Sequence, residues 1–388
     1  MTASPAAYLL LHLFLRLTAK TCWQCLQDGG QFCLDNNQCI VDVLTIETKC
    51  NRIVDLPINC PSVPALQYAY DDDFVRNTVL PVIAATGTDN PQKCLDNQLP
   101  SMKVYKRREA NCSSLFSDVT CSGYTGIDFD RKVIVLSVRG SHGDHQYYDL
   151  WKIGNFNGTV PFLNIGRVTK KFNDNFESLW YSGLGEDLQN LIDAYPDYQL
   201  WITGYSMGAS IALLTSAFIA QTGMSSPYNM KVILFGCPRC TDYDFAMWHS
   251  TNFPYSYHII HAHDYAPRLP FFDNIDNTTL YHPRSEVWYN NDMREGDSFV
   301  ICEQADQPFC SSQVQNLSNA DHAHYFNMDL YRWSADGCPK NKEDYRPIAE
   351  SAVKNGKTFS YDLLIVILGA EKCTTNLENT INGGQRYR

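Results

Sequence analysis

The chain contains 388 residues, of which 44% are hydrophobic and 13% aromatic, so a disordered or fibrous protein is excluded. A chain of this length can form one large domain with appendages or two ordinary domains. Its 31 basic and 42 acidic residues give a formal net charge of -11. Since no block of basic residues stands out, this charge argues against a nucleic-acid partner and against a polybasic membrane-surface protein.

Residues 1–19 are predicted to form a secretory signal peptide. The apolar run at residues 8–19 is too short to span a bilayer and has the length of a signal's hydrophobic region. No Lys or Arg precedes the run, and His12 and Arg16 interrupt it, so a buried N-terminal helix is the alternative. Ala19 is the expected cleavage point.

Residues 20–62 are predicted to form a small module held together by disulfides. A zinc ribbon is the alternative, but it requires a second close cysteine pair that the spacing does not supply. Four glycosylation sequons also favour export to an oxidising, extracellular location. The six cysteines of the module are Cys22, Cys25, Cys33, Cys39, Cys50 and Cys60, and the sequons begin at Asn111, Asn157, Asn277 and Asn316.

The 15 cysteines leave at least one without a partner, and we expect it in the group Cys94, Cys112 and Cys121. Spacing does not determine the connectivity. Among the rest, Cys237 lies close to Cys240 and Cys302 close to Cys310, followed by Cys338 and Cys373.

Residues 63–337 are predicted to form one α/β domain. Strand-like and helix-like patterns alternate there, which implies right-handed crossovers and a mainly parallel sheet covered on both faces. The expected strands are residues 132–138, 198–203, 231–235 and 257–261, and the expected helices are 172–195 and 211–219.

Residues 338–388 are predicted to form a C-terminal extension, which is polar except for Leu363–Leu368. Six apolar residues are too few to span a membrane, so we expect a packed strand or an irregular tail there. After removal of the signal, no membrane-spanning segment is expected.

The motif Gly204-Tyr205-Ser206-Met207-Gly208 lies between an expected strand and an expected helix. At a turn from strand to helix, the two glycines allow the strand and the helix to approach each other closely. The serine is then held in a strained conformation that exposes its hydroxyl. The N–H groups of Met207 and Gly208 begin the helix and are directed at the same point. The alternative is a tight turn with a serine that has no chemical role.

A nucleophilic serine needs a base, and the base needs an acid that fixes its tautomer. Asp264 follows the strand at 257–261, where α/β enzymes place catalytic groups. His322 and His324 both fit the spacing of a base. Asp264 as a turn cap, and a metal site built on the His-x-His pairs at 261–263 and 322–324, are the alternatives, although no His-Glu-x-x-His motif supports a metal.

The first expected strand runs into Arg139-Gly140-Ser141-His142-Gly143. A loop at this edge of the sheet could bring the N–H and hydroxyl of Ser141 to a substrate carbonyl oxygen as an oxyanion donor. A simple glycine turn is the alternative.

Five segments in order resemble the class 3, fungal-type lipase family, and the cysteine-rich start and the Cys302–Cys310 region resemble its secreted nematode members. This resemblance implies an α/β-hydrolase fold preceded by the disulfide-rich module. The matching segments are Val135–Ser141, Trp201–Ala209, Phe235–Arg239, His261–Pro270 and Asp321–Phe326.

The resemblance implies that Ser206 is the nucleophile, Asp264 the orienting acid and His322 the base, since the family's histidine stands three residues before Tyr-Phe. Ser141 and Met207 would then form the oxyanion hole. It also implies a lid over the acyl site at residues 142–155. The chain departs from the family at Tyr205, Met207 and Ala209, where His, Leu and Gly are usual.

The sequence therefore predicts a secreted serine hydrolase that cleaves lipid carboxylic esters, in the manner of a triacylglycerol lipase, through an acyl-enzyme. Its expected partner is a lipid ester at a lipid–water interface, without a metal, an organic cofactor or an obligate protein partner. A phospholipase A1 or carboxylesterase, a catalytically silent lipid-binding protein and a metal hydrolase are the alternatives.

Overall fold

The computed structural model describes residues 20–41, 50–113, 119–142, 158–270, 274–275, 278–306 and 310–347. Several predicted features lie outside these ranges. They are the signal at 1–19, the lid beyond His142, the sequons at Asn157 and Asn277, the run Leu363–Leu368, and Cys373.

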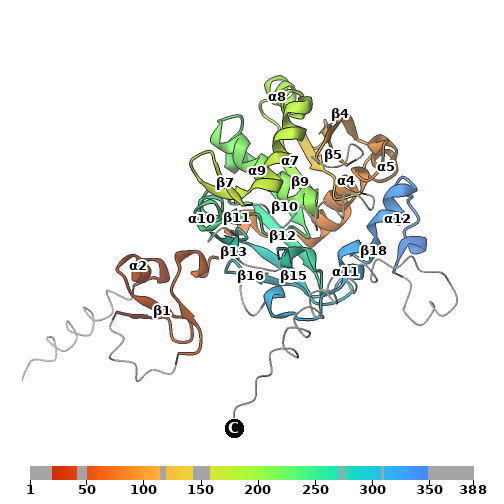
Figure 1. Cartoon of the computed structure of the whole chain (residues 1–388). Coiled ribbons are helices and arrows are strands. Elements are labelled where there is room, and N and C mark those ends of the chain that lie inside the picture. Colours follow the sequence, from red (N-terminus) through yellow and green to blue (C-terminus); the bar gives the residue numbers. More distant parts are fainter. Residues whose placement is uncertain are drawn as a thin grey trace, which may run out of the picture.

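One eight-stranded sheet forms the centre of the molecule, in the order β16-β15-β12-β10-β9-β6-β5-β4 (Figure 1). The five strands from β15 to β6 are mutually parallel, as predicted, whereas β16, β5 and β4 pair antiparallel at the two edges. The four predicted strands are β6 (Val133–Val138), β9 (Gln199–Tyr205), β10 (Met230–Phe235) and β12 (Ser256–His261). The sequence patterns missed β4 (Met102–Asn111), β5 (Thr120–Asp128), β15 (Glu286–Tyr289) and β16 (Val300–Cys302).

Helices cover both faces of this sheet, because its central strands are apolar on both sides. Strand β6 shows this directly: Ile134, Leu136 and Val138 belong to one core and Val133 and Val135 to the other. The first core contains α7 (Lys170–Leu179), α8 (Gly185–Ala194) and α9 (Met207–Gln221). The second contains α4 (Leu80–Ala85), α5 (Pro91–Gln98) and α12 (Leu330–Ala335).

The prediction of a single helix at residues 172–195 is wrong in one respect, because the helix is divided at Gly183. This glycine has a φ of 108°, and a π-helical turn, η5 (Trp180–Leu184), separates α7 from α8. Only glycine adopts such a backbone without strain, and periodicity alone does not reveal the break. The apolar stripe still faces one core on both sides of the break.

A second sheet, in the order β13-β14-β11-β8-β7, packs beside the first core and carries helix α10 (Tyr243–Asn252). Its strands are short and were not predicted. They are β7 (Thr159–Phe162), β8 (Gly166–Thr169), β11 (Thr241–Asp242), β13 (Asn274–Ile275) and β14 (Thr278–Tyr281).

The N-terminal module is a three-stranded sheet with one helix, and it lies beside the α/β body (Figure 1). Three disulfides join its six cysteines: Cys22–Cys60, Cys25–Cys39 and Cys33–Cys50. Its elements are α2 (Cys22–Gln27), β1 (Gln31–Cys33), β2 (Gln38–Ile40) and β3 (Ile53–Val54).

The module ends in the short helix η2 (Pro57–Asn59), which fastens it to the body. The Arg284 side chain donates hydrogen bonds to the carbonyl oxygens of Pro57 and Ile58, at 3.2 and 3.1 Å. Ile58 is fully buried against Ala246 and Ala305. Hydrogen bonds from the Arg284 side chain and the buried Ile58 side chain therefore fix the point at which the module joins the body.

Three further disulfides tie the body together: Cys94–Cys338, Cys112–Cys121 and Cys302–Cys310. The expectation that an unpaired cysteine lies among Cys94, Cys112 and Cys121 is wrong, because all three are bonded. The free thiols of the described residues are Cys237 and Cys240, both buried. Burial raises the pKa of Cys237 to about 12, which disfavours a reactive thiolate there.

Among the described residues, we find no helix with the length and apolar character needed to cross a membrane.

The disulfide Cys94–Cys338 joins residues separated by 244 positions, whereas Cys112–Cys121 spans a separation of nine. In the chain-entropy model, replacing both cysteines of the long pair with serine lowers the free energy of unfolding by about 5 kcal/mol, and of the short pair by about 3 kcal/mol. Urea denaturation of both double variants measures the difference. A larger loss for the short pair would contradict this expectation.

Candidate active site

Ser206 occupies the sharp turn between β9 and α9. Its backbone has a φ of 56° and a ψ of -129°, the strained conformation that the motif predicts. A Cβ at Gly204 would lie 2.3 Å from the Gly208 carbonyl oxygen, and one at Gly208 would lie 2.4 Å from the Val138 carbonyl oxygen. Both glycines are therefore required, the first for the approach of strand to helix and the second for the approach of helix to β6.

His322 lies between Ser206 and Asp264, and its two ring nitrogens reach both. Nε2 lies 2.9 Å from Ser206 Oγ, and Nδ1 lies 3.0 Å from Asp264 Oδ2. Because a carboxylate only accepts hydrogen bonds, Nδ1 carries the proton and Nε2 accepts from the serine hydroxyl. This is the tautomer that a general base needs.

Asp264 follows β12 and is almost completely buried. Its carboxylate accepts hydrogen bonds from the Ala266 N–H at 2.8 Å and from the Tyr325 hydroxyl at 2.6 Å, besides the one from His322. Burial raises the pKa of Tyr325 well above its ordinary value, so this hydroxyl remains a donor. These donors solvate the negative charge of Asp264 and fix its orientation.

The loop after β12 and the segment that carries His322 are fastened to each other. The Asp321 carboxylate accepts from the His263 N–H at 2.9 Å, and the Asp321 carbonyl oxygen lies 3.0 Å from His261 Nδ1. The Ser318 N–H donates to the His263 carbonyl oxygen at 2.7 Å. These contacts form a clamp between His261 and His263 on one segment and Ser318 and Asp321 on the other. The clamp explains why Asp264 and His322 lie next to each other, and the sequence patterns did not indicate it.

His324, the other candidate base, has a different environment. Helix α11 (Asn319–Ala323) ends before it, and its Nδ1 lies 2.6 Å from the Ala320 carbonyl oxygen. The structure therefore brings His322, not His324, to the serine hydroxyl.

Ser141 and Met207 lie together beside Ser206. The Ser141 hydroxyl is 3.9 Å from Met207 Sδ, and both residues are buried. Met207 is the first residue of α9, and the first N–H groups of a helix have no acceptor within the helix. The two residues predicted as oxyanion donors are thus neighbours at the end of β6 and the start of α9.

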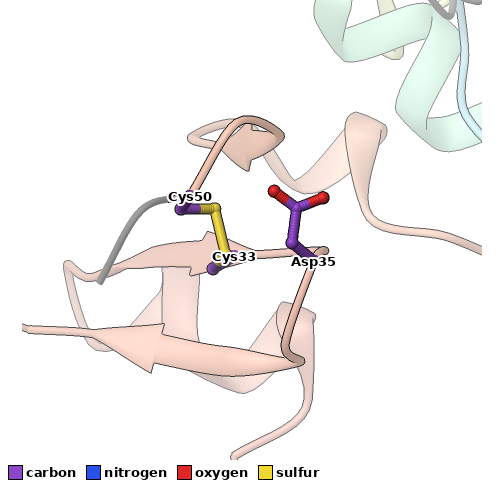
Figure 2. A group of neighbouring side chains, drawn as sticks. All are labelled: Cys33, Asp35 and Cys50. Atoms are coloured by element: carbon purple, nitrogen blue, oxygen red, sulfur yellow. A yellow bond between two sulfur atoms is a disulfide. The ribbon is translucent and has the colours of Figure 1, made fainter.

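Among the described residues, the clusters of possible metal ligands do not include the histidines of the pairs at 261–263 and 322–324. The cluster of Cys33, Asp35 and Cys50 resembles a ligand set, but Figure 2 shows its two sulfurs joined in a disulfide. Its carboxylate pairs with Arg52, at 2.7 Å. A disulfide cannot supply thiolate ligands, so this cluster is structural.

The site is thus the sharp strand-to-helix turn of an α/β-hydrolase fold, and its serine, histidine and aspartate are joined by hydrogen bonds. A family model described as "Lipase (class 3)" matches residues 135–274. The chain belongs to the class 3 lipase family.

Two proteins from Caenorhabditis elegans are similar to this chain. An uncharacterised protein is 33% identical over 253 residues, covering 64% of this chain and 90% of its own length. A protein named as a lipase is 26% identical over 246 residues, covering 56% of this chain and 68% of its own. Among solved structures, a lipase from Rhizopus microsporus var. chinensis has the same fold, with a TM-score of 0.56 and 22% identity, over 73% of this chain and 94% of its own.

Gly236 follows β10 and packs directly against the site. With a φ of 54°, its Cβ position lies 2.7 Å from Asp264 Oδ2 and 3.0 Å from His322 Cε1. We expect Gly236→Ala to lower ester turnover about 10²-fold, because the added methyl displaces the carboxylate and the imidazole. Turnover per folded molecule measures this effect.

Gly223→Ala is the matched control, since Gly223 has a φ of 77° and open space at its Cβ position. It should cost about 1 kcal/mol of stability, from the backbone alone, and leave turnover unchanged. An equal loss of turnover in both variants would show that backbone strain, rather than overlap with the site, is responsible.

Proposed function

We propose that this protein is a secreted serine hydrolase that cleaves carboxylic ester bonds of lipids through an acyl-enzyme, in the manner of a triacylglycerol lipase. The observation that carries the proposal is the continuous hydrogen-bond chain from Ser206 Oγ through His322 to Asp264. Membership of the class 3 lipase family supports ester hydrolysis as the reaction class.

In the proposed reaction, Ser206 Oγ bonds to the ester carbonyl carbon while His322 Nε2 takes the hydroxyl proton. The imidazolium then donates this proton to the departing alcohol, which leaves the acyl group on Ser206. Water, deprotonated by His322 Nε2, then attacks the acyl carbon, and the imidazolium returns the proton to Ser206 Oγ as the bond between Ser206 and the acyl group breaks and the fatty acid leaves. Asp264 stabilises the imidazolium without accepting its proton.

The negative charge that forms on the carbonyl oxygen requires donors beside Ser206. We assign this role to the N–H of Met207 and to the N–H and hydroxyl of Ser141. Their contact at the start of α9 supports the assignment, because a helix N-terminus favours negative charge.

Export is part of the proposal and is supported by the covalent structure. Six disulfides join twelve of the cysteines, which is typical of proteins that fold in oxidising compartments. The sequon asparagines Asn111 and Asn316 are exposed, as glycosylation requires.

A fluorophosphonate ester tests the nucleophile, since it modifies only a serine that is activated by a base and an oxyanion hole. We expect labelling at Ser206, identified by peptide mass mapping of the secreted protein in detergent. Absence of label on well-folded protein would instead favour a silent lipid-binding protein.

Substitution separates the proposed roles. Ser206→Ala and His322→Ala should each lower ester hydrolysis by several orders of magnitude, on the order of 10⁶, whereas His324→Ala should not. Ser141→Ala should lower turnover by about 10 to 10³, because its N–H remains. A damaging His324→Ala would contradict the assignment of the base.

The substrate alternatives are a phospholipase A1 and a carboxylesterase of soluble esters. A lipase whose site is covered by a lid should gain rate sharply once the ester exceeds its solubility, whereas an esterase should not. Rates on a short ester across its solubility limit, and on emulsified triacylglycerol and phospholipid, distinguish the three.

A further inference from the structure

Tyr205 precedes the proposed nucleophile and is the last residue of β9. We propose that Tyr205 is a positioning residue for His322, which holds the imidazole in the plane that joins Ser206 to Asp264. This inference rests on the proposed function and adds to it a residue that does not contact the ester. It concerns the position at which this chain departs from the usual histidine of the family.

The contacts of Tyr205 with His322 are of two kinds. The two rings are stacked, with centroids 4.9 Å apart and an interplanar angle of 21°. The Tyr205 hydroxyl donates a hydrogen bond to the His322 carbonyl oxygen, at 2.5 Å. One side chain therefore holds both the ring and the backbone of the same histidine.

These contacts restrain motions of the imidazole that its hydrogen bonds to Asp264 and Ser206 do not restrain. Bonds at Nδ1 and Nε2 fix the imidazole within its own plane, but they resist tilting out of that plane only weakly. A stacked ring opposes this tilt, and the Tyr265 ring meets the imidazole edge-on, at 4.9 Å and 65°. The aromatic contacts thus complete the restraint of the ring.

The backbone of His322 also needs external support. Helix α11 has five residues, and a helix this short is unstable by itself. Positive φ values at Phe326 and Asn327 follow closely. The hydrogen bond from Tyr205 fixes the His322 carbonyl oxygen directly, in addition to the clamp through Asp321.

Neighbouring residues pack around the ring of Tyr205. Edge-on contacts come from Tyr325 and Tyr331, at centroid distances of 6.1 and 6.0 Å. A Cβ at Gly140 would lie 2.8 Å from Tyr205 Cδ1, so the loop that carries Ser141 leaves room for this side chain. The face of the Tyr205 ring also attracts the positive imidazolium that forms during the reaction.

The test uses two variants and a matched control. Tyr205→Phe keeps the stacked ring and removes the hydroxyl, and Tyr205→Leu removes both. Tyr124→Phe is the control, because the buried Tyr124 hydroxyl likewise donates to a backbone carbonyl, that of Val82 at 2.9 Å, away from Ser206. The readouts are the rate constant for fluorophosphonate labelling of Ser206, kcat and KM for a short soluble ester, and the thermal midpoint.

We expect Tyr205→Phe to lower the labelling rate and kcat about fivefold and Tyr205→Leu about 50-fold, with KM unchanged, since the contacts act on the base and not on the ester. Tyr124→Phe should remain within about twofold of the wild type, even if its thermal midpoint falls as much as that of Tyr205→Phe.

Wild-type rates in both Tyr205 variants, or an equal loss of rate in Tyr124→Phe, would overturn the positioning role while the wild-type protein still labels at Ser206. Absence of label on the wild type would instead refute the proposed function, and the positioning role with it.

Discussion

The strained backbone of Ser206 is the constraint around which the site is arranged. A φ of 56° at this residue turns the chain from β9 into α9 without a connecting loop, so the hydroxyl lies at the end of the parallel strands. Strain of this kind persists only where the packing leaves no alternative. Here Gly204 and Gly208 let backbone atoms approach where any side chain would collide, and Gly140 does the same beside Tyr205.

The partners of Ser206, Asp264 and His322, lie 58 and 116 residues farther along the chain. The order of the sheet brings them near, since β12 lies two strands from β9. Proximity alone does not set hydrogen-bond geometry, however. The contacts between His261, His263 and Asp321 and the hydrogen bond from the Tyr325 hydroxyl restrain the positions of His322 and Asp264.

The disulfides add covalent links both to the small N-terminal module and to the hydrophobic cores of the body. The N-terminal module has a small apolar cluster of its own, and three crosslinks compensate for that deficit. In the body, Cys94–Cys338 ties the region after α12 to α5, and both of its cysteines are buried within the second core. The covalent framework therefore supports the fold, whereas hydrogen bonds join Ser206, His322 and Asp264.

Local chemistry determined much of this protein. The apolar runs predict β6, β9, β10 and β12, and the Gly-x-Ser-x-Gly turn predicts a strained serine, because both depend on residues close in sequence. Edge strands β4 and β16 escaped prediction although each pairs with its neighbour in the chain, because β4 is largely polar and exposed and β16 has only three residues, so neither contains an apolar run that marks a strand.

The tertiary structure decided the questions that spacing left open. Spacing allowed both His322 and His324 as the base, and only the end of α11 directs one ring to Ser206 and the other to Ala320. The pairing of Cys94 with Cys338, the break at Gly183 and the stacking of Tyr205 on His322 likewise join groups that no local pattern relates. Contacts between distant segments depend on how the whole chain packs, and patterns within a few consecutive residues do not indicate that packing.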